Sequence, residues 1–169
     1  ESYYELAKSL GLKVAFVDYA GNSTYQIMKQ QIGPEVSLVI QVENDSTVIN
    51  IFKDNVLQLQ RMVPYGKSML VNAVMEKYGL KYDAATAKLQ AETLLHSRFD
   101  GDEVTESLRY MASNINRVID YYVSRNRISI QESYLIGHST TIKGFATLLS
   151  NELNMPIKKV ESLKNITLD

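Results

Sequence analysis

Three short strand patterns follow one another between residues 37 and 63, and they restrict the fold more than any other part of the chain. Ser37–Val42 (SLVIQV) is almost wholly apolar, whereas Thr47–Lys53 (TVINIFK) and Val56–Val63 (VLQLQRMV) alternate. Asp54-Asn55 joins the last two through a tight turn, because both residue types tolerate left-handed backbone conformations. The sequence therefore predicts an antiparallel three-strand meander.

Helical patterns dominate the chain after the meander. Helices are predicted, in chain order, over Gly66–Tyr78, Ala84–Leu95 (capped by Asp83), Glu103–Arg125 and Thr141–Leu153. Short strands are predicted at Ser133–Gly137 and Ile157–Val160, with the former beside the first strand of the meander. The fold class is therefore α/β: a ribonuclease-H-like half of an actin fold, with a mixed sheet flanked by helices. Its predicted buried strand residues are Leu38, Ile40, Ile49, Ile51, Leu57, Leu59 and Leu135.

The first 33 residues form a separate pattern. A helix over Tyr3–Leu10 ends at Gly11, an apolar strand is predicted at Lys13–Asp18, and Asn22 or Ser23 caps a helix to about Gln31. The chain begins with Glu, which suggests a fragment of a longer protein. An apolar strand without neighbours exposes a free edge, so we expect it to pair with a second copy in a homodimer.

The composition excludes several classes of protein. With 18 basic and 19 acidic residues, the formal net charge of −1 does not suggest a nucleic-acid partner. There are no cysteines, and hence neither disulfides nor thiolate metal sites. The longest apolar runs are far too short to cross a bilayer, and the N-terminal segment does not look like a signal peptide. The sequence is typical of a cytoplasmic protein that does not itself span a membrane.

Several motifs together resemble the PilM family of type IV pilus assembly proteins, within the FtsA/actin-like ATPase superfamily. Leu38–Leu57 resembles the family's second phosphate loop, in which a strand ends in Asp-x-Gly before Thr-Thr and a second strand. Pro64–Lys67 resembles its Pro-x-Gly-Gly, and Leu135–Phe145 resembles its adenosine loop. The resemblance spans nearly the whole chain and implies the C-terminal half of the fold.

The resemblance also implies a domain division. Residues 1–33 would end the N-terminal actin-like half, and residues 34–169 would form the C-terminal subdomain (IIA), with a IIB-like helical insertion at about 80–125. The nucleotide-site positions that it implies are Gln41, Glu43, Asp45, Ser46, Thr47, Gly66, Gly137, His138 and Ser139.

Departures from the family pattern indicate that this nucleotide site is degenerate. Gln41 replaces the acid that would order the water shell of Mg²⁺, and Glu43 places a side chain and a negative charge where the family has glycine. In the adenosine loop only Gly137 is kept, followed by His138 and Ser139. We therefore expect no catalytic residue, no metal and no cofactor, while ATP and Mg²⁺ binding by a longer protein stays open.

Simpler interpretations compete at individual residues. The pair of acids Glu43 and Asp45 is more typical of a solvated hairpin turn than of a cation site, and His138 of a loop residue satisfied by backbone. Tyr121-Tyr122, near the end of the long helix, suits an interaction surface or a cap on the core equally well.

The resemblance implies a scaffold rather than an enzyme. Such a protein would lie at the inner face of the cytoplasmic membrane, where it would bind the N-terminal tail of a PilN-like bitopic membrane protein and contact other pilus platform components. Two alternatives stay open: a competent FtsA-like actin-fold ATPase, and the cytoplasmic domain of a type II secretion platform protein.

Overall fold

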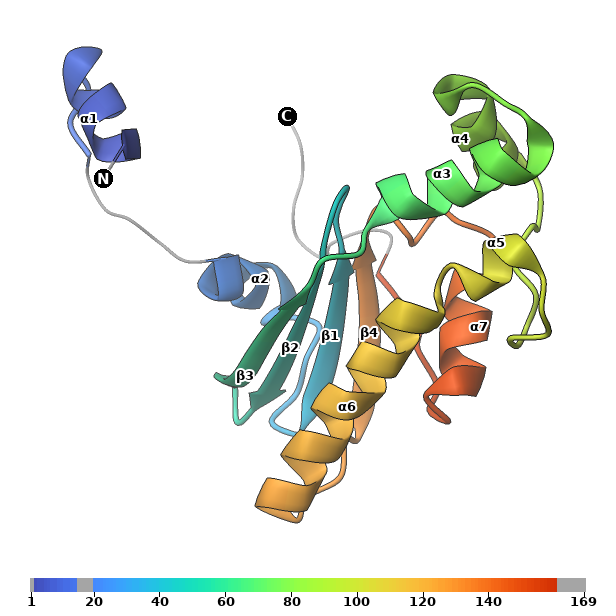
Figure 1. The fold of residues 1–169 in the computed structure, drawn as a ribbon. Helices are drawn as coiled ribbons and strands as arrows, with labels where there is room; N and C mark the ends of the chain where they lie inside the picture. Colours follow the sequence, from blue (N-terminus) through green and yellow to red (C-terminus); the bar gives the residue numbers. More distant parts are fainter. Residues whose placement is uncertain (1, 15–19, 161–169) are drawn as a thin grey trace.

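The computed structural model describes residues 2–14 and 20–160 as helices, strands and the loops between them (Figure 1). The helices are α1 Ser2–Ser9, α2 Ala20–Met28, α3 Lys67–Tyr78, α4 Tyr82–Ala91, α5 Glu103–Glu106, α6 Arg109–Asn126 and α7 Phe145–Glu152. The strands are β1 Ser37–Val42, β2 Thr47–Lys53, β3 Val56–Val63, β4 Glu132–Gly137 and β5 Lys158–Lys159. None of the described helices combines the length and the apolarity needed to cross a bilayer.

The five strands form one mixed sheet in the order β3-β2-β1-β4-β5. β1, β2 and β3 pair antiparallel, and β4 lies parallel to β1, so the predicted meander and the placement of the later strand beside its first member are confirmed. Asp54 and Asn55 both have positive φ, at 51° and 61°, as the two-residue turn requires. The last strand is shorter than predicted, and β4 begins one residue earlier, at Glu132.

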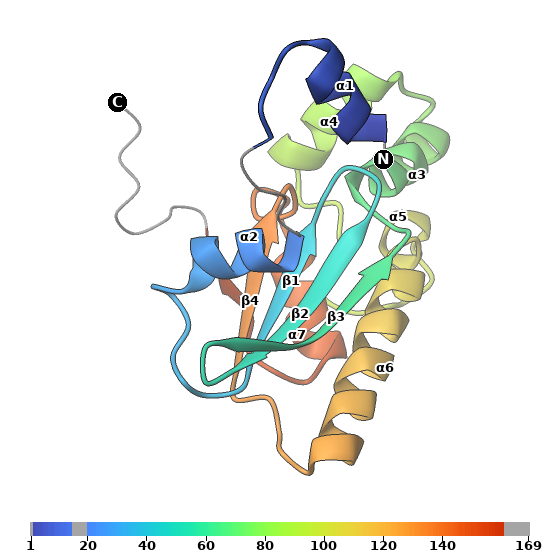
Figure 2. The same ribbon diagram turned by 90° about the vertical axis from the view of Figure 1, so that its left-hand side faces the viewer.

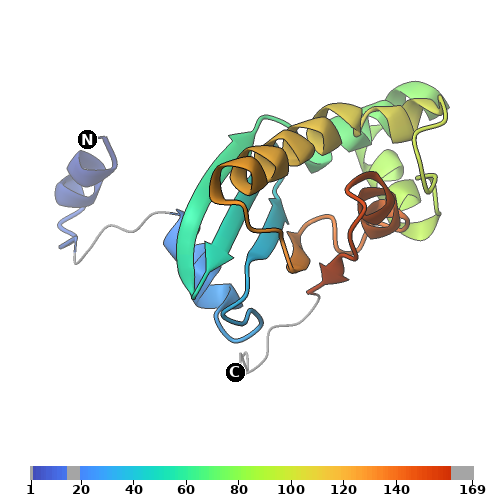
Figure 3. The same cartoon turned by 90° about the horizontal axis from the view of Figure 1, so that it is seen from below.

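Helices cover both faces of the sheet and create two cores. The views agree that α6 and α7 lie on one face and α2 on the other (Figures 1, 2 and 3). Alternation along β2 divides its side chains: Ile49 and Ile51 enter the larger core, while Phe52 faces the smaller one beneath α2. Five of the seven predicted core residues are fully buried, but Leu57 and Leu59 are only half-buried because β3 is an edge strand.

The predicted single helix over Glu103–Arg125 is wrong. The chain instead forms the short α5 and the long α6, separated at Ser107 and Leu108. The Ser107 hydroxyl donates to the Val104 carbonyl at 2.7 Å and lies 3.1 Å from the Tyr65 hydroxyl. The Leu108 N–H bonds to the Thr105 carbonyl three residues back, at 3.1 Å, so the α-helical ladder is interrupted here although the apolar spacing continues.

Other helix boundaries also differ from prediction. Asp83 does not cap α4, which starts after Lys81 and ends at Ala91 because Glu92 is extended. α7 begins only at Phe145, since Gly144 has φ of 83° and the residues before it form turns. α2 starts two residues before Asn22 and ends at Met28. Most of the strand predicted at Lys13–Asp18, and the dimer inferred from it, lie outside the described residues.

A cap and an ion pair hold α5 against α3. The Asp102 side chain accepts a hydrogen bond from the Thr105 backbone N–H at 3.0 Å and pairs with Lys77, at the end of α3. Burial alone would raise the pKa of Asp102, but the bonds from Lys77 and Thr105 outweigh it and lower the pKa to about 2. The charged form therefore stabilises the fold.

Replacing Asp102 with asparagine is expected to lower the free energy of unfolding by about 1–2 kcal/mol at pH 6, a value reduced by solvent screening at this site. The folded pKa lies below the unfolded value of about 3.9, so this contribution is present above about pH 4 and is lost as the pH falls toward 2. Urea denaturation of both proteins between pH 6 and 3 measures it. A difference that stays constant over this range would contradict the assignment.

Candidate functional site

The carboxyl ends of β1 and β4 meet at one edge of the sheet, because these strands are parallel and Val42 lies opposite Gly137. The backbone N–H of His138 donates to the Val42 carbonyl at 2.8 Å. Gly137 has φ of 86°, and a Cβ there would lie 2.4 Å from the Val42 carbonyl oxygen, so only glycine fits this crossing. The structure thus brings together the two predicted loops, after β1 and after β4.

A chain of hydrogen bonds occupies the end of β1. The Thr24 hydroxyl, from α2, donates to Gln41 Oε1 at 2.7 Å, and Gln41 Nε2 donates to Glu43 Oε1 at 2.6 Å. Both ends of the Gln41 amide are therefore used, and the Glu43 carboxylate is turned toward Gln41. An aspartate at position 41 would set two negative charges against each other, so the two substitutions suit one another.

The turn between β1 and β2 is bound to the start of α3. Backbone N–H groups of Lys67 and Ser68 donate to the carbonyls of Glu43 and Asn44 at 3.0 and 2.8 Å, and the Ser68 hydroxyl donates to Asp45 Oδ1 at 2.7 Å. The N–H groups with which a helix N-terminus binds an anion are thus already engaged here. A Cβ on Gly66 would lie 2.4 Å from the Asn44 carbonyl oxygen, which shows how closely the two segments approach.

Ser46 and Thr47 anchor the other side of this turn. The Ser46 carbonyl accepts from the Glu43 N–H at 2.8 Å, and the buried Thr47 hydroxyl donates to the Tyr65 carbonyl at 2.7 Å. Burial raises the pKa of Tyr65 to about 12, although its hydrogen bond with Ser107 acts in the opposite direction. Tyr65 is therefore neutral at physiological pH. The hydroxyl of Thr47 is used in a hydrogen bond within the fold, to the Tyr65 carbonyl.

The loop after β4 is a tight turn. His138 is exposed, and its backbone N–H is the one that bonds to Val42. Ser139 is fully buried, and its hydroxyl has no hydrogen-bond partner within the described part of the chain. The Thr140 hydroxyl donates back to the Gly137 carbonyl at 3.1 Å, which closes the turn.

A cavity of about 360 Å³ lies between α2 and this edge of the sheet. Its lining residues are Ile27, Gln41, Glu43, Ile136, Gly137, Thr140 and Val160. The lining carries one carboxylate and includes neither lysine nor arginine, so it does not suit a phosphate group. Across residues 2–14 and 20–160, no group of three or more His, Asp or Glu side chains is arranged to hold a metal ion.

Sequence reasoning missed the partners that define this arrangement. Thr24 was assigned to a helix, but nothing in its spacing shows that it faces Gln41, 17 residues later. Ser68 was likewise a helix position, and its bonds to the β1–β2 turn follow from the approach of α3. The one available signal was the residue type of Ser68, because serine in the first turn of a helix often bonds to nearby backbone groups.

Similar folds occur in actin-like proteins. A chain of the PilM-PilN type IV pilus biogenesis complex superposes with a TM-score of 0.70 at 16% identity, over 94% of this chain and 46% of that one. MreB5 of Spiroplasma citri bound to ADP gives 0.67 at 12% identity, covering 95% and 59%. Ta0583, an archaeal actin homolog, gives 0.57 at 15%, covering 83% and 47%. This chain thus has an actin-like fold and spans about half the length of these structures.

Sequence comparison is more specific than the fold. No curated protein sequence matches this chain. The family model of the type IV pilus assembly protein PilM, however, matches residues 1–169, which is the whole sequence. The chain therefore belongs to the PilM family of type IV pilus assembly proteins.

Proposed function

We propose that this chain is the C-terminal actin-like part of a scaffold in a type IV pilus assembly machine, and that its nucleotide site is degenerate. The family match over the whole chain supports the pilus role. The observation that carries the degenerate site is the hydrogen-bonded series Thr24–Gln41–Glu43, which fills the end of β1 with an amide and a carboxylate. A phosphate about 4 Å from the carboxylate would cost on the order of 4 kcal/mol at an effective dielectric of 20.

The domain division follows from the same proposal. Residues 34–169 form the IIA subdomain, and the segment at about 80–125 is a IIB-like helical insertion. Residues 1–33 complete the N-terminal half, which would supply neighbours for the strand predicted at Lys13–Asp18. A homodimer through the strand predicted at Lys13–Asp18 is the form that this proposal expects for a protein in which those neighbours are absent.

The proposed partner is the N-terminal tail of a PilN-like bitopic membrane protein. The support is the similarity of this fold to a chain from the PilM-PilN complex. Binding such a tail would hold the protein at the cytoplasmic face of the inner membrane, where other platform components are within reach. This role requires a stable surface and does not require nucleotide turnover.

The proposal is tested by titrating a synthetic peptide into this chain, with and without Mg²⁺ and ATP. The peptide has the N-terminal sequence of the PilN-like protein from the same organism. We expect binding that is independent of nucleotide, and no calorimetric signal when ATP and Mg²⁺ alone are added. The double variant Gln41→Asp, Glu43→Gly is expected to improve nucleotide binding by at least about tenfold, since it removes the carboxylate and restores the acid.

Two results would contradict separate parts of the proposal. Micromolar, Mg²⁺-dependent ATP binding by the unmodified protein would favour the alternative of a competent ATPase. The similarity of this fold to ADP-bound MreB5 is the observation that supports this alternative. Failure of the peptide to bind would remove the scaffold partner and leave the nucleotide argument intact. Thr24→Val serves as the control, because it removes the hydrogen bond from the Thr24 hydroxyl to Gln41 without changing any charge.

A further inference from the structure

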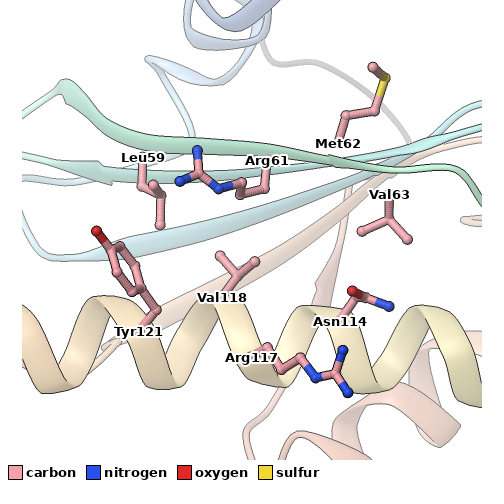
Figure 4. A pocket seen from close by; sticks show the side chains of 8 residues that line it. All are labelled: Leu59, Arg61, Met62, Val63, Asn114, Arg117, Val118 and Tyr121. Atoms are coloured by element: carbon pink, nitrogen blue, oxygen red, sulfur yellow. The ribbon is translucent and has the colours of Figure 1, made fainter.

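A groove of about 250 Å³ runs between β3 and α6. Figure 4 shows Leu59 and Val63 pointing from β3 toward the helix and the Arg61 side chain lying along the strand, while Asn114, Val118 and Tyr121 point from α6 toward the strand (Figure 4). Met62, between the inward-pointing residues of β3, turns to the other face and is 70% exposed. The strand therefore presents apolar, basic and apolar side chains at alternate positions.

The edge of β3 beside this groove is free within the described chain. β3 is the terminal strand of the sheet, and β2 is its neighbour on the inner side. Along its other side, no backbone of residues 2–14 or 20–160 continues the ladder. Such an edge presents N–H and C=O groups that can pair with an extended segment of another protein.

The charge at the groove is positive. Arg61 and Arg117 both line it, and none of the eight lining residues is acidic. Arg61 donates to the Gln60 carbonyl, and neither arginine forms an ion pair with a described carboxylate. Tyr121 is 46% exposed and holds Arg125 through its hydroxyl at 2.7 Å, so a third cation lies close by.

An arginine on an edge strand also has a simpler explanation, because a charge there discourages two identical edges from pairing. That explanation accounts for Arg61 alone. It does not account for the groove, for the second arginine on α6, or for the exposed tyrosine that closes the groove at one end. It also predicts a different result in the experiment below.

We propose that β3 and this groove bind an extended acidic segment of a partner protein, which adds to the sheet beside β3. The sequence of the strand sets the chemistry of the segment: apolar, any, acidic, any, apolar. Its acid would meet Arg61, while Arg117 on the facing helix adds positive charge, and its two apolar side chains would lie beside Leu59, Val63 and Val118. Because this pattern is symmetric, it fits in either strand direction.

The probe is a fluorescein-labelled peptide, Thr-Val-Thr-Glu-Thr-Val-Thr, titrated into the full chain and followed by fluorescence anisotropy. Two control peptides have the same length: one replaces the glutamate with lysine, and one moves the glutamate by one residue, which turns it to the opposite face of a strand. A third carries N-methyl groups on the glutamate and on the threonines that flank it, which blocks backbone pairing on both edges.

We expect the first peptide to bind with an affinity that falls as salt rises, and the three controls to bind at least about tenfold more weakly. Arg61→Glu and Arg117→Glu should each weaken binding by about ten- to a hundredfold. The matched control is Arg98→Glu, an exposed arginine in the loop before α5, which makes the same charge change and should leave binding unaltered.

Two results would overturn the proposal. One is equal binding of the original and shifted peptides, or no binding of either, by a protein that circular dichroism shows to be folded. The other is self-association of Arg61→Val in sedimentation velocity without any binding of the acidic peptide, because Arg61 would then act only as a guard of the edge.

Discussion

Replacing Ile40 with alanine is expected to lower the free energy of unfolding by about 3–4 kcal/mol. Ile40 is fully buried on the central strand β1, opposite Ile49 on β2 and Leu135 on β4. Its side chain lies in the larger core, between the sheet and the helices on that face. Truncation removes apolar contact and leaves a cavity that strands paired on both sides cannot close.

Urea denaturation followed by far-ultraviolet circular dichroism measures this loss as a shift of the midpoint at constant slope. Ile40→Val should cost about 1 kcal/mol, because it deletes one methylene group. Met62→Ala, on the edge strand, should change stability by less than about 0.5 kcal/mol. If Ile40→Ala cost no more than Met62→Ala, the central position of β1 in the sheet would be wrong.

Replacing Gly66 with alanine is expected to destabilise the protein by about 2–3 kcal/mol and to separate α3 from the β1–β2 turn. The new Cβ would lie 2.4 Å from the Asn44 carbonyl oxygen and 2.6 Å from the Asp45 nitrogen, and both atoms belong to the backbone. Relief requires the start of α3 to move, which breaks the bonds that Ser68 makes to Asn44 and Asp45.

The control is Gly33→Ala, where the new Cβ would also lie 2.4 Å from another atom. That atom is an oxygen of the exposed Glu35 side chain, which can rotate away, so we expect little change in stability. Amide hydrogen exchange at Lys67 and Ser68 should rise in the Gly66 variant and stay unchanged in the control. Equal thermal midpoints for the two variants would contradict the close approach of these segments.

The sequence predicted the elements whose signals are local. The alternation in Thr47–Lys53 and Val56–Val63 and the Asp54-Asn55 turn predicted both strands with the bounds that the structure has. Helix α3 was predicted to within one residue, and it ends at Tyr78 as predicted, before Gly79, which has φ of 64°. At the site, His138 lies in the loop after β4, as the end of the predicted strand at Gly137 indicates.

The prediction of one helix over Glu103–Arg125 failed where hydrogen bonds, and not apolar spacing, decide the structure. The apolar spacing of Val104, Leu108 and Met111 continues through the break at Ser107, because all three remain buried on either side of it. The two helices differ from one in their hydrogen bonds at the break, where the Ser107 hydroxyl bonds to Val104 and the Leu108 N–H bonds to Thr105. Periodicity records which residues are buried and carries no information about such bonds.

The sequence by itself determined the meander, the family and the absence of an acid at position 41. Only the tertiary structure decided what Gln41 does, because its partners Thr24 and Glu43 come from a helix and a turn on either side of it. The groove beside β3 also required coordinates, since Arg61 and Arg117 are 56 positions apart along the chain and line the same groove only because α6 packs beside β3. Local sequence patterns predict individual helices and strands, whereas sites form where helices and strands that are distant in sequence pack together.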